Sequence, residues 1–138
     1  MPAKDKYHDV VVAALEKEGW QITHDPYKLM LGKRRGYIDL GAEKLVAAER
    51  EGQKIAVEIK SFLGASILDD FEDALGQVIV YKAALLRKEP ERILYLAMPS
   101  GAYEDLFDDS FFVGILEQNG IRLIVYHLNE KTIIKWTK

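Results

Sequence analysis

Two opposite charges inside one apolar strand restrict the fold of this sequence more than any other feature. Residues 55–62 read Ile-Ala-Val-Glu-Ile-Lys-Ser-Phe, a short apolar run rich in β-branched residues, which predicts a strand. Because side chains alternate along a strand, Glu58 and Lys60 share one face, and Val57 and Ile59 share the other. Burying a carboxylate and an ammonium is costly without partners, so the fold must supply compensating groups on the Glu58 face.

Asp39 is the nearest candidate for such a group. It lies in a second short apolar segment, Tyr37–Leu40, which we predict to be another strand. Two carboxylates are the ligands expected for a magnesium-type cation, and a lysine beside them can orient a water or stabilise a developing phosphate charge. Asp39, Glu58 and Lys60 therefore indicate a metal-dependent site. In the alternative, purely structural interpretation, Glu58 and Lys60 satisfy each other as a buried pair.

The composition predicts one domain, spanning residues 1–138. The chain is 49% apolar and 30% charged, which is ordinary for a globular protein with a real core. Its net charge of −3 argues against a generic, salt-driven coating of nucleic acid, so any contact with DNA should be local. The absence of cysteine excludes disulfides and thiolate metal sites and fits a cytoplasmic location. No apolar run approaches membrane-spanning length, so we expect no membrane association.

The order of predicted elements indicates an α/β (α+β) fold with a mixed central sheet flanked by helices. We predict helices over residues 4–18, 66–86 and 105–119, and strands over residues 20–23, 27–31, 37–40, 45–49, 55–62, 92–98, 121–128 and 132–136. The early strands form an antiparallel meander, whereas the strand–long helix–strand order that follows allows a parallel crossover. Ser66 and Asp69 resemble a capping box at the start of the long helix.

Two further positions lie on predicted helices. Gln77 and Tyr81 are four residues apart on the long helix, so they sit one above the other. His8 lies on the same side of the first helix as Val11 and Leu15. A histidine packed against the core is the commoner outcome, and the alternative is an auxiliary group at the metal site.

A basic segment between two glycines, Gly32–Gly36, contains Lys33, Arg34 and Arg35 and is the densest positive cluster in the chain. A solvated turn is one interpretation. Its position just before Asp39 makes a phosphate-contacting, nucleic-acid-binding loop the other.

The order of these motifs resembles the core of the PD-(D/E)xK, or restriction-endonuclease-like, superfamily. Asp39 takes the place of the motif aspartate, Glu58 and Lys60 take the places of the acid and the lysine, and Gln77 with Tyr81 matches the Gln-x-x-x-Tyr helix of the RecB-like branch. The resemblance implies a single-domain nuclease-like fold and a site that binds Mg²⁺ or Mn²⁺. The metal ligands would be Asp39, Glu58 and the backbone carbonyl of Ile59.

More closely, the whole chain resembles the XisH family of fdxN element excision controlling factors. The stretches that carry this resemblance are residues 4–9, 19–26, 37–43, 57–62 and 76–81. The resemblance implies a bacterial protein that controls a programmed DNA excision carried out by a separate recombinase. It also implies a companion protein of the XisI family.

Two functions follow from these patterns. The first is a magnesium-dependent deoxyribonuclease, in which Lys60 positions a water or stabilises the transition state, and Gln77 and Tyr81 order Lys60 or a phosphate. The second is a non-cleaving regulatory module that keeps the fold and binds DNA or a XisI-like partner. Aromatic residues near the C-terminal end, if exposed, would mark an interface, so we expect a homodimer or a complex with the companion protein. They are Phe107, Phe111, Phe112, Tyr126 and Trp136.

Overall fold

The structure is a computed structural model that describes residues 6–36 and 45–137. Its helices are α1 (Lys6–Lys17), α2 (Ile67–Lys88), α3 (Ser100–Phe107) and α4 (Ser110–Gln118). Its strands are β1 (Gln21–His24), β2 (Leu29–Leu31), β3 (Arg34–Gly36), β4 (Leu45–Arg50), β5 (Gln53–Ile59), β6 (Ile93–Pro99), β7 (Arg122–His127) and β8 (Thr132–Trp136). No helix in the described ranges is long and apolar enough to cross a membrane.

Six strands form one mixed sheet in the order β1-β4-β5-β6-β7-β8. The central strands β5, β6 and β7 are parallel, whereas β1, β4 and β8 pair antiparallel with their neighbours. The predicted mixed sheet and the parallel crossover through the long helix are therefore confirmed. The strand that carries Glu58 is the third of six, and its residues 55–59 are buried on both faces of the sheet.

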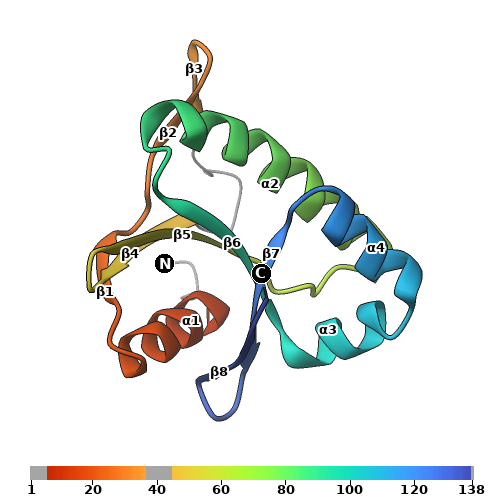
Figure 1. Cartoon of the computed structure of the whole chain (residues 1–138). Helices are drawn as coiled ribbons and strands as arrows, with labels where there is room; N and C mark the ends of the chain where they lie inside the picture. Colours follow the sequence, from red (N-terminus) through yellow and green to blue (C-terminus); the bar gives the residue numbers. More distant parts are fainter. Residues whose placement is uncertain (1–5, 37–44, 138) are drawn as a thin grey trace, which may run out of the picture.

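The helices divide between the two faces of the sheet, with α1 on one side and α2, α3 and α4 on the other (Figure 1). Alternation along β5 follows the predicted pattern. Val57 and Ile59 pack with Val11 and Leu15 of α1, and Ala56 packs in the cluster on the α2 side. Glu58 therefore points toward the α2 side.

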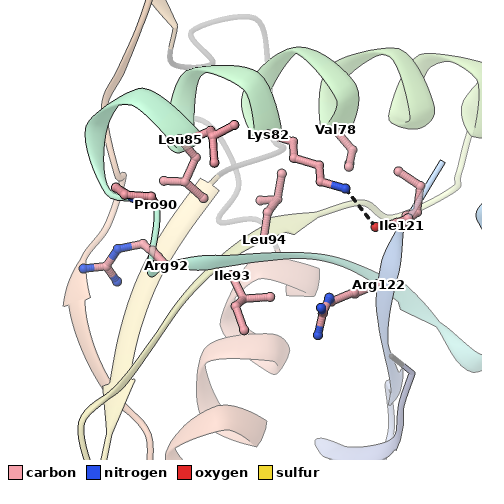
Figure 2. Close-up of a pocket in the computed structure, with 11 residues that line it drawn as sticks. Val78, Lys82, Leu85, Pro90, Arg92, Ile93, Leu94, Ile121 and Arg122 are labelled. Atoms are coloured by element: carbon pink, nitrogen blue, oxygen red, sulfur yellow. Dashed lines mark hydrogen bonds between the residues drawn. The ribbon is translucent and has the colours of Figure 1, made fainter.

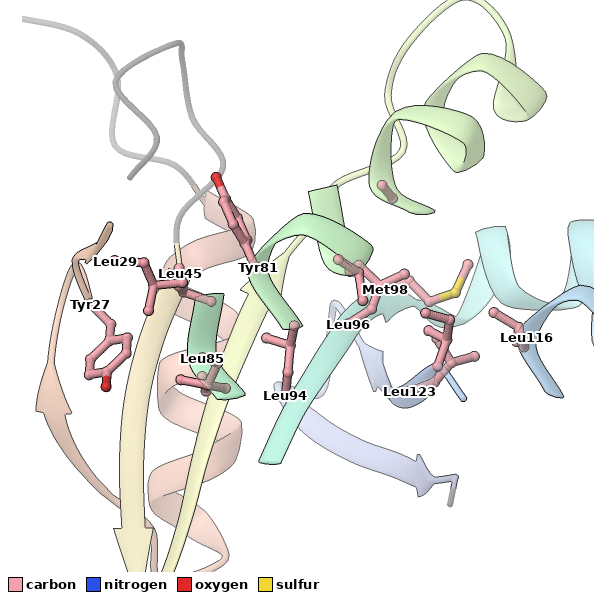
Figure 3. Close-up of a cluster of buried hydrophobic side chains, with 14 of the residues drawn as sticks. Tyr27, Leu29, Leu45, Tyr81, Leu85, Leu94, Leu96, Met98, Leu116 and Leu123 are labelled. Carbon is pink, nitrogen blue, oxygen red and sulfur yellow. The ribbon is translucent and has the colours of Figure 1, made fainter. Parts of the chain in front are cut away.

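Helix α2 is the longest element of the described chain, and its start follows the prediction. The Ser66 hydroxyl accepts a hydrogen bond from the Asp69 backbone N–H at 3.2 Å, which caps the first turn. Near its C-terminal end, Lys82 donates to the carbonyl of Gly120 at 3.2 Å and ties the helix to the start of β7 (Figure 2). Its buried residues join the larger core cluster with leucines from β4, β6 and β7 (Figure 3).

The predicted helix over residues 105–119 is wrong. The chain forms two helices, α3 and α4, because the Asp109 carboxylate accepts a hydrogen bond from the Phe111 backbone N–H at 2.9 Å and caps a new helix. The break directs Phe107 and Phe112 edge-on against Phe71, each at 5.7 Å between ring centroids. Helix α3 also begins earlier than predicted, at Ser100, directly after β6.

The basic segment between the glycines is a hairpin rather than a simple turn. Leu31 of β2 pairs with Arg34 of β3, and Gly32, with φ +64°, makes the reversal. The hairpin forms a separate two-stranded sheet and packs on α2. The predicted strand over residues 37–40 lies outside the described residues, and so does Asp39.

Candidate functional site

Glu58 and Lys60 are held at the carboxyl end of the central strand. Glu58 is fully buried, at 0% exposure, between its strand neighbours Leu45 of β4 and Leu96 of β6. Lys60, 6% exposed, follows β5, where its backbone N–H donates to the Ala97 carbonyl at 3.0 Å. The backbone on both sides of these two charges is therefore fixed by the sheet.

The two charges attract each other without a direct hydrogen bond. The Lys60 ammonium lies 3.9 Å from Glu58 Oε2, which exceeds hydrogen-bonding distance. The Lys60 carbonyl accepts a hydrogen bond from the Tyr126 hydroxyl at 3.1 Å, so the main chain of Lys60 is held from β7 as well. Burying an ion pair in a loose geometry is unfavourable for stability, and groups of this kind cluster at functional sites.

Tyr81 is brought to the same region by α2. It is 6% exposed and belongs to the buried cluster that contains Leu45 and Leu94, and its hydroxyl points away from Leu85 and Leu94 (Figure 3). Burial, and then the negative charge of Glu58, raise the pKa of the Tyr81 phenol to about 12. Tyr81 is therefore a neutral hydroxyl at physiological pH, within the electrostatic reach of Glu58.

Gln77 lies one turn before Tyr81 on α2. Its side-chain oxygen is buried and has no hydrogen-bond partner within the described ranges. A buried amide oxygen of this kind is expensive unless it binds something. The structure thus brings the helix pair Gln77 and Tyr81 and the strand pair Glu58 and Lys60 to the same side of the sheet.

The ring nitrogens of His8 contact aspartate side chains that lie outside the candidate site. Its Nε2 lies 2.8 Å and 2.9 Å from the two carboxylate oxygens of Asp25, and its Nδ1 lies 3.3 Å from Asp9. These contacts join α1 to the segment after β1, and α1 packs on the face of the sheet opposite the α2 side. An auxiliary role of His8 in metal binding stays a prediction.

The predicted phosphate-contacting residues lie at the tip of the β2–β3 hairpin. Lys33 and Arg34 are exposed there, whereas the side chain of Arg35 lies outside the description. A groove of about 450 Å³ adjoins the hairpin and has a cationic rim that the sequence analysis missed. The cations of this rim are Lys28, Arg87 and Lys88, and Leu29 and Met30 also line the groove. The signal was present in Arg87 and Lys88, but a helix C-terminus explains such residues equally well.

The donor groups present fit a hard divalent cation. Among the residues that the structure describes, no three His, Cys, Asp or Glu side chains gather in a metal-binding cluster. Glu58 supplies one carboxylate, and the backbone carbonyl of Ile59 is the further oxygen ligand that the sequence analysis named. Mg²⁺ binds oxygen and is commonly held by one or two protein carboxylates, so this all-oxygen set suits it.

A second buried cluster of charges, around Arg92, was not anticipated from the sequence. The Arg92 guanidinium donates to both carboxylate oxygens of Glu89, at 2.9 Å and 3.3 Å, and to the Ile55 carbonyl at 3.0 Å. The Tyr27 hydroxyl donates to the same carboxylate. These hydrogen bonds, first from Arg92 and then from Tyr27, lower the pKa of Glu89 to about 2. Burial, and then the hydrogen bond to Glu89, raise the pKa of Tyr27 to about 12.

A cavity of about 320 Å³ lies between α2 and the ends of β6 and β7 (Figure 2). It is lined by Val78, Lys82, Leu94 and Arg122, among others. Glu58 and Lys60 do not line it, so it is separate from the candidate site.

Comparison with known proteins identifies one family. The family model described as XisH protein matches residues 1–134. A crystal structure of an XisH family protein from Nostoc punctiforme PCC 73102 is 44% identical, with a TM-score of 0.90 over 97% of this chain and 100% of that chain. The structure of an fdxN element excision controlling factor protein from Anabaena variabilis is 43% identical, with a TM-score of 0.89 over 98% and 100%. A search of curated proteins found no match.

Proposed function

Since the chain belongs to the XisH family, we propose that it controls the excision of a DNA element through a metal-dependent, endonuclease-like site of the PD-(D/E)xK type. The observation that carries this proposal is the pair Glu58 and Lys60, buried at the end of the central strand and only 3.9 Å apart. A fold that needed only stability would gain more from apolar residues at these two positions.

In this site Glu58, Asp39 and the Ile59 carbonyl would hold Mg²⁺ or Mn²⁺. Such an ion would supply Lewis-acid polarisation of a phosphate oxygen and help to activate a water. The Lys60 ammonium orients the attacking water or stabilises the charge that develops on the phosphate oxygens. The neutral Tyr81 hydroxyl, as a hydrogen-bond donor, and the Gln77 amide order Lys60 or the scissile phosphate.

DNA reaches this site along the basic hairpin. Lys33, Arg34 and Arg35 contact the phosphate backbone, which positions the duplex without reading its sequence. The net charge of −3 makes such contacts local. A XisI-like protein is the proposed companion, and it supplies the remaining affinity or the specificity.

The test is a cleavage assay on supercoiled, linear and single-stranded DNA with Mg²⁺, Mn²⁺ or a chelator, with and without the XisI-like protein. Glu58→Gln and Lys60→Met should each lower the rate by about 10²-fold or more, since each removes a charge that acts on the transition state. Glu58→Gln should also weaken Mg²⁺ binding measured by calorimetry, whereas Lys60→Met should not. Glu117→Gln, at an exposed position on α4, is the matched control and should cut at the wild-type rate.

A negative result in the metal-binding and cleavage assays would also decide the question. If the wild-type chain binds no divalent ion at millimolar concentration and cuts no DNA form, even with the companion protein present, the nuclease proposal is wrong. Partner binding that survives both substitutions would then assign the chain to the non-cleaving modules of this fold.

A further inference from the structure

Helix α2 exposes an apolar stripe on the face that turns away from the sheet. Its inner face, with Phe71, Val78 and Leu85, is buried, and the helix packs through it on β2, β6 and α3. On the outer face Ile79 and Val80 are 44% and 47% exposed. Large apolar side chains that lie next to one another and face solvent indicate an interaction surface.

Gly76 adds a second, independent observation. It lies in the interior of α2, where glycine is less favourable than alanine. A Cβ atom at this position would meet no heavy atom within 4 Å in the described structure. Packing among residues 6–36 and 45–137 therefore gives no reason for a glycine here, whereas the close approach of another helix would.

The charges on the same outer face are polarised along the helix. At about 100° per residue, Asp69, Glu72 and Asp73 share the outer face with Gly76, Ile79, Val80, Ala83 and Arg87. The N-terminal end of this face is therefore acidic, the middle is apolar and the C-terminal end is basic. An antiparallel copy of the helix would place its acidic end on the basic end of the first.

The positions also match in register. Around a point between Ile79 and Val80, Gly76 is as far from the centre as Ala83, and Glu72 is as far as Arg87. Glu72 and Arg87 lie about 22 Å apart along the axis at 1.5 Å per residue. In an antiparallel pair centred on this point, two small residues face each other and two Glu–Arg contacts form at the ends.

From these features we propose that a second copy of the chain packs against the outer face of α2, with the two α2 helices antiparallel around a two-fold axis. The contact is isologous and closes on itself, so it produces a dimer rather than a filament. Gly76 and Ala83 allow close approach of the two backbones, Ile79 and Val80 form the apolar centre, and Glu72 and Arg87 set the register. The inner faces of the paired helices would carry Gln77 and Tyr81 of both copies, so the dimer joins two candidate sites.

Sedimentation velocity of the full chain over a concentration series tests the surface. The wild-type chain should show a monomer–dimer equilibrium. Val80→Glu should shift it to monomer, whereas Ile134→Glu, at a position on β8 that is 56% exposed, should leave it unchanged. A wild-type chain that stays monomeric at every concentration overturns the proposal, and so does a dimer that Val80→Glu leaves intact.

Exchanging the charges of Glu72 and Arg87 tests whether these two residues face each other across the dimer. Glu72→Lys and Arg87→Glu should each raise the dissociation constant by about tenfold or more, because each places like charges opposite each other. The double variant should return it close to the wild-type value. Single variants that weaken the dimer without recovery in the double variant would show that the two residues do not meet.

Gly76→Ala separates helix stability from assembly. In dilute protein, where the monomer dominates, alanine should raise the unfolding temperature because it favours helix. The same substitution should weaken the dimer, and Gly76→Leu should weaken it more. A Gly76→Leu dimer as tight as the wild type overturns the close approach.

Discussion

Two clusters of buried charge lie beside α2, and they differ in how their charges are satisfied. At the cluster of Tyr27, Glu89 and Arg92, each charge meets its partner in a direct hydrogen bond, with Arg92 bidentate on the carboxylate. At the candidate site, Glu58 and Lys60 are more deeply buried as a pair but 3.9 Å apart. The first arrangement is that of a structural link between elements. The second is the pair on which the proposed metal-dependent site rests.

The backbone contacts support the same distinction. Arg92 also donates to the carbonyls of Ile55 and Ala48, so it joins β4 and β5 to the end of α2. In the candidate site the main chain of Lys60 is tied to the neighbouring strands, by its N–H to Ala97 and by its carbonyl to the Tyr126 hydroxyl. Stability and function are therefore expected to separate when the two clusters are mutated.

The largest effect should come from Arg92→Met. Removing the guanidinium leaves the Glu89 carboxylate without its main partner and takes a donor away from the Ile55 and Ala48 carbonyls, so the free energy of unfolding should fall by about 3–5 kcal/mol. Urea denaturation measures this loss. Arg34→Met, at an exposed hairpin position, is the control and should stay within about 0.5 kcal/mol of the wild type. If the two variants were equally stable, the Arg92 cluster would have no structural role.

Two tyrosines provide the next comparison. Tyr27→Phe should lower the free energy of unfolding by about 1–2 kcal/mol, because it removes a hydrogen bond to a charged carboxylate. Tyr81→Phe should change it by less than about 0.5 kcal/mol but should slow DNA cleavage. If Tyr81→Phe proves the more destabilising change, the hydroxyl of Tyr81 is structural and the contrast between the clusters fails.

Lowering the pH should remove the stabilising contribution of Glu89 in the Arg92 cluster. The pKa of Glu89 is about 2 in the folded chain and 4.5 as its ordinary value, so its stabilising contribution is fully present above the ordinary value. It is lost as the pH falls from 4.5 toward 2. Denaturation measured across this window should show a smaller loss in Glu89→Gln than in the wild type. Parallel pH profiles of the two proteins would contradict the lowered pKa.

The smallest effect on stability should come from replacing both charges of the candidate site. Glu58→Gln with Lys60→Met removes the buried ion pair together, so neither charge is left alone, and the free energy of unfolding should stay within about 1 kcal/mol of the wild type or rise. Cleavage should be lost. A large loss of stability in this double variant, comparable to that of Arg92→Met, would make the pair structural after all.

Local patterns in the sequence determined much of the architecture. The alternation of Val57, Glu58, Ile59 and Lys60 predicted a strand with its charges on one face, and Ser66 predicted the start of the long helix. Both rest on interactions between residues a few positions apart, which a short segment encodes by itself. The relation to the XisH family followed from stretches of this kind and was confirmed.

Tertiary structure decided what depends on residues far apart in the chain. Tyr27 and Glu89, separated by 62 residues, meet only because β2 and the end of α2 pack together. The break between α3 and α4 depends on Asp109 as a cap and on Phe71 as the packing partner of two rings, and the helical pattern of residues 105–119 contains neither fact. The same holds for the candidate site, where the sequence named Glu58 and Tyr81 but only the packing of α2 on the sheet brings the phenol within the field of the carboxylate. Periodicity encodes which face a residue occupies, whereas the partner on that face is chosen by long-range packing.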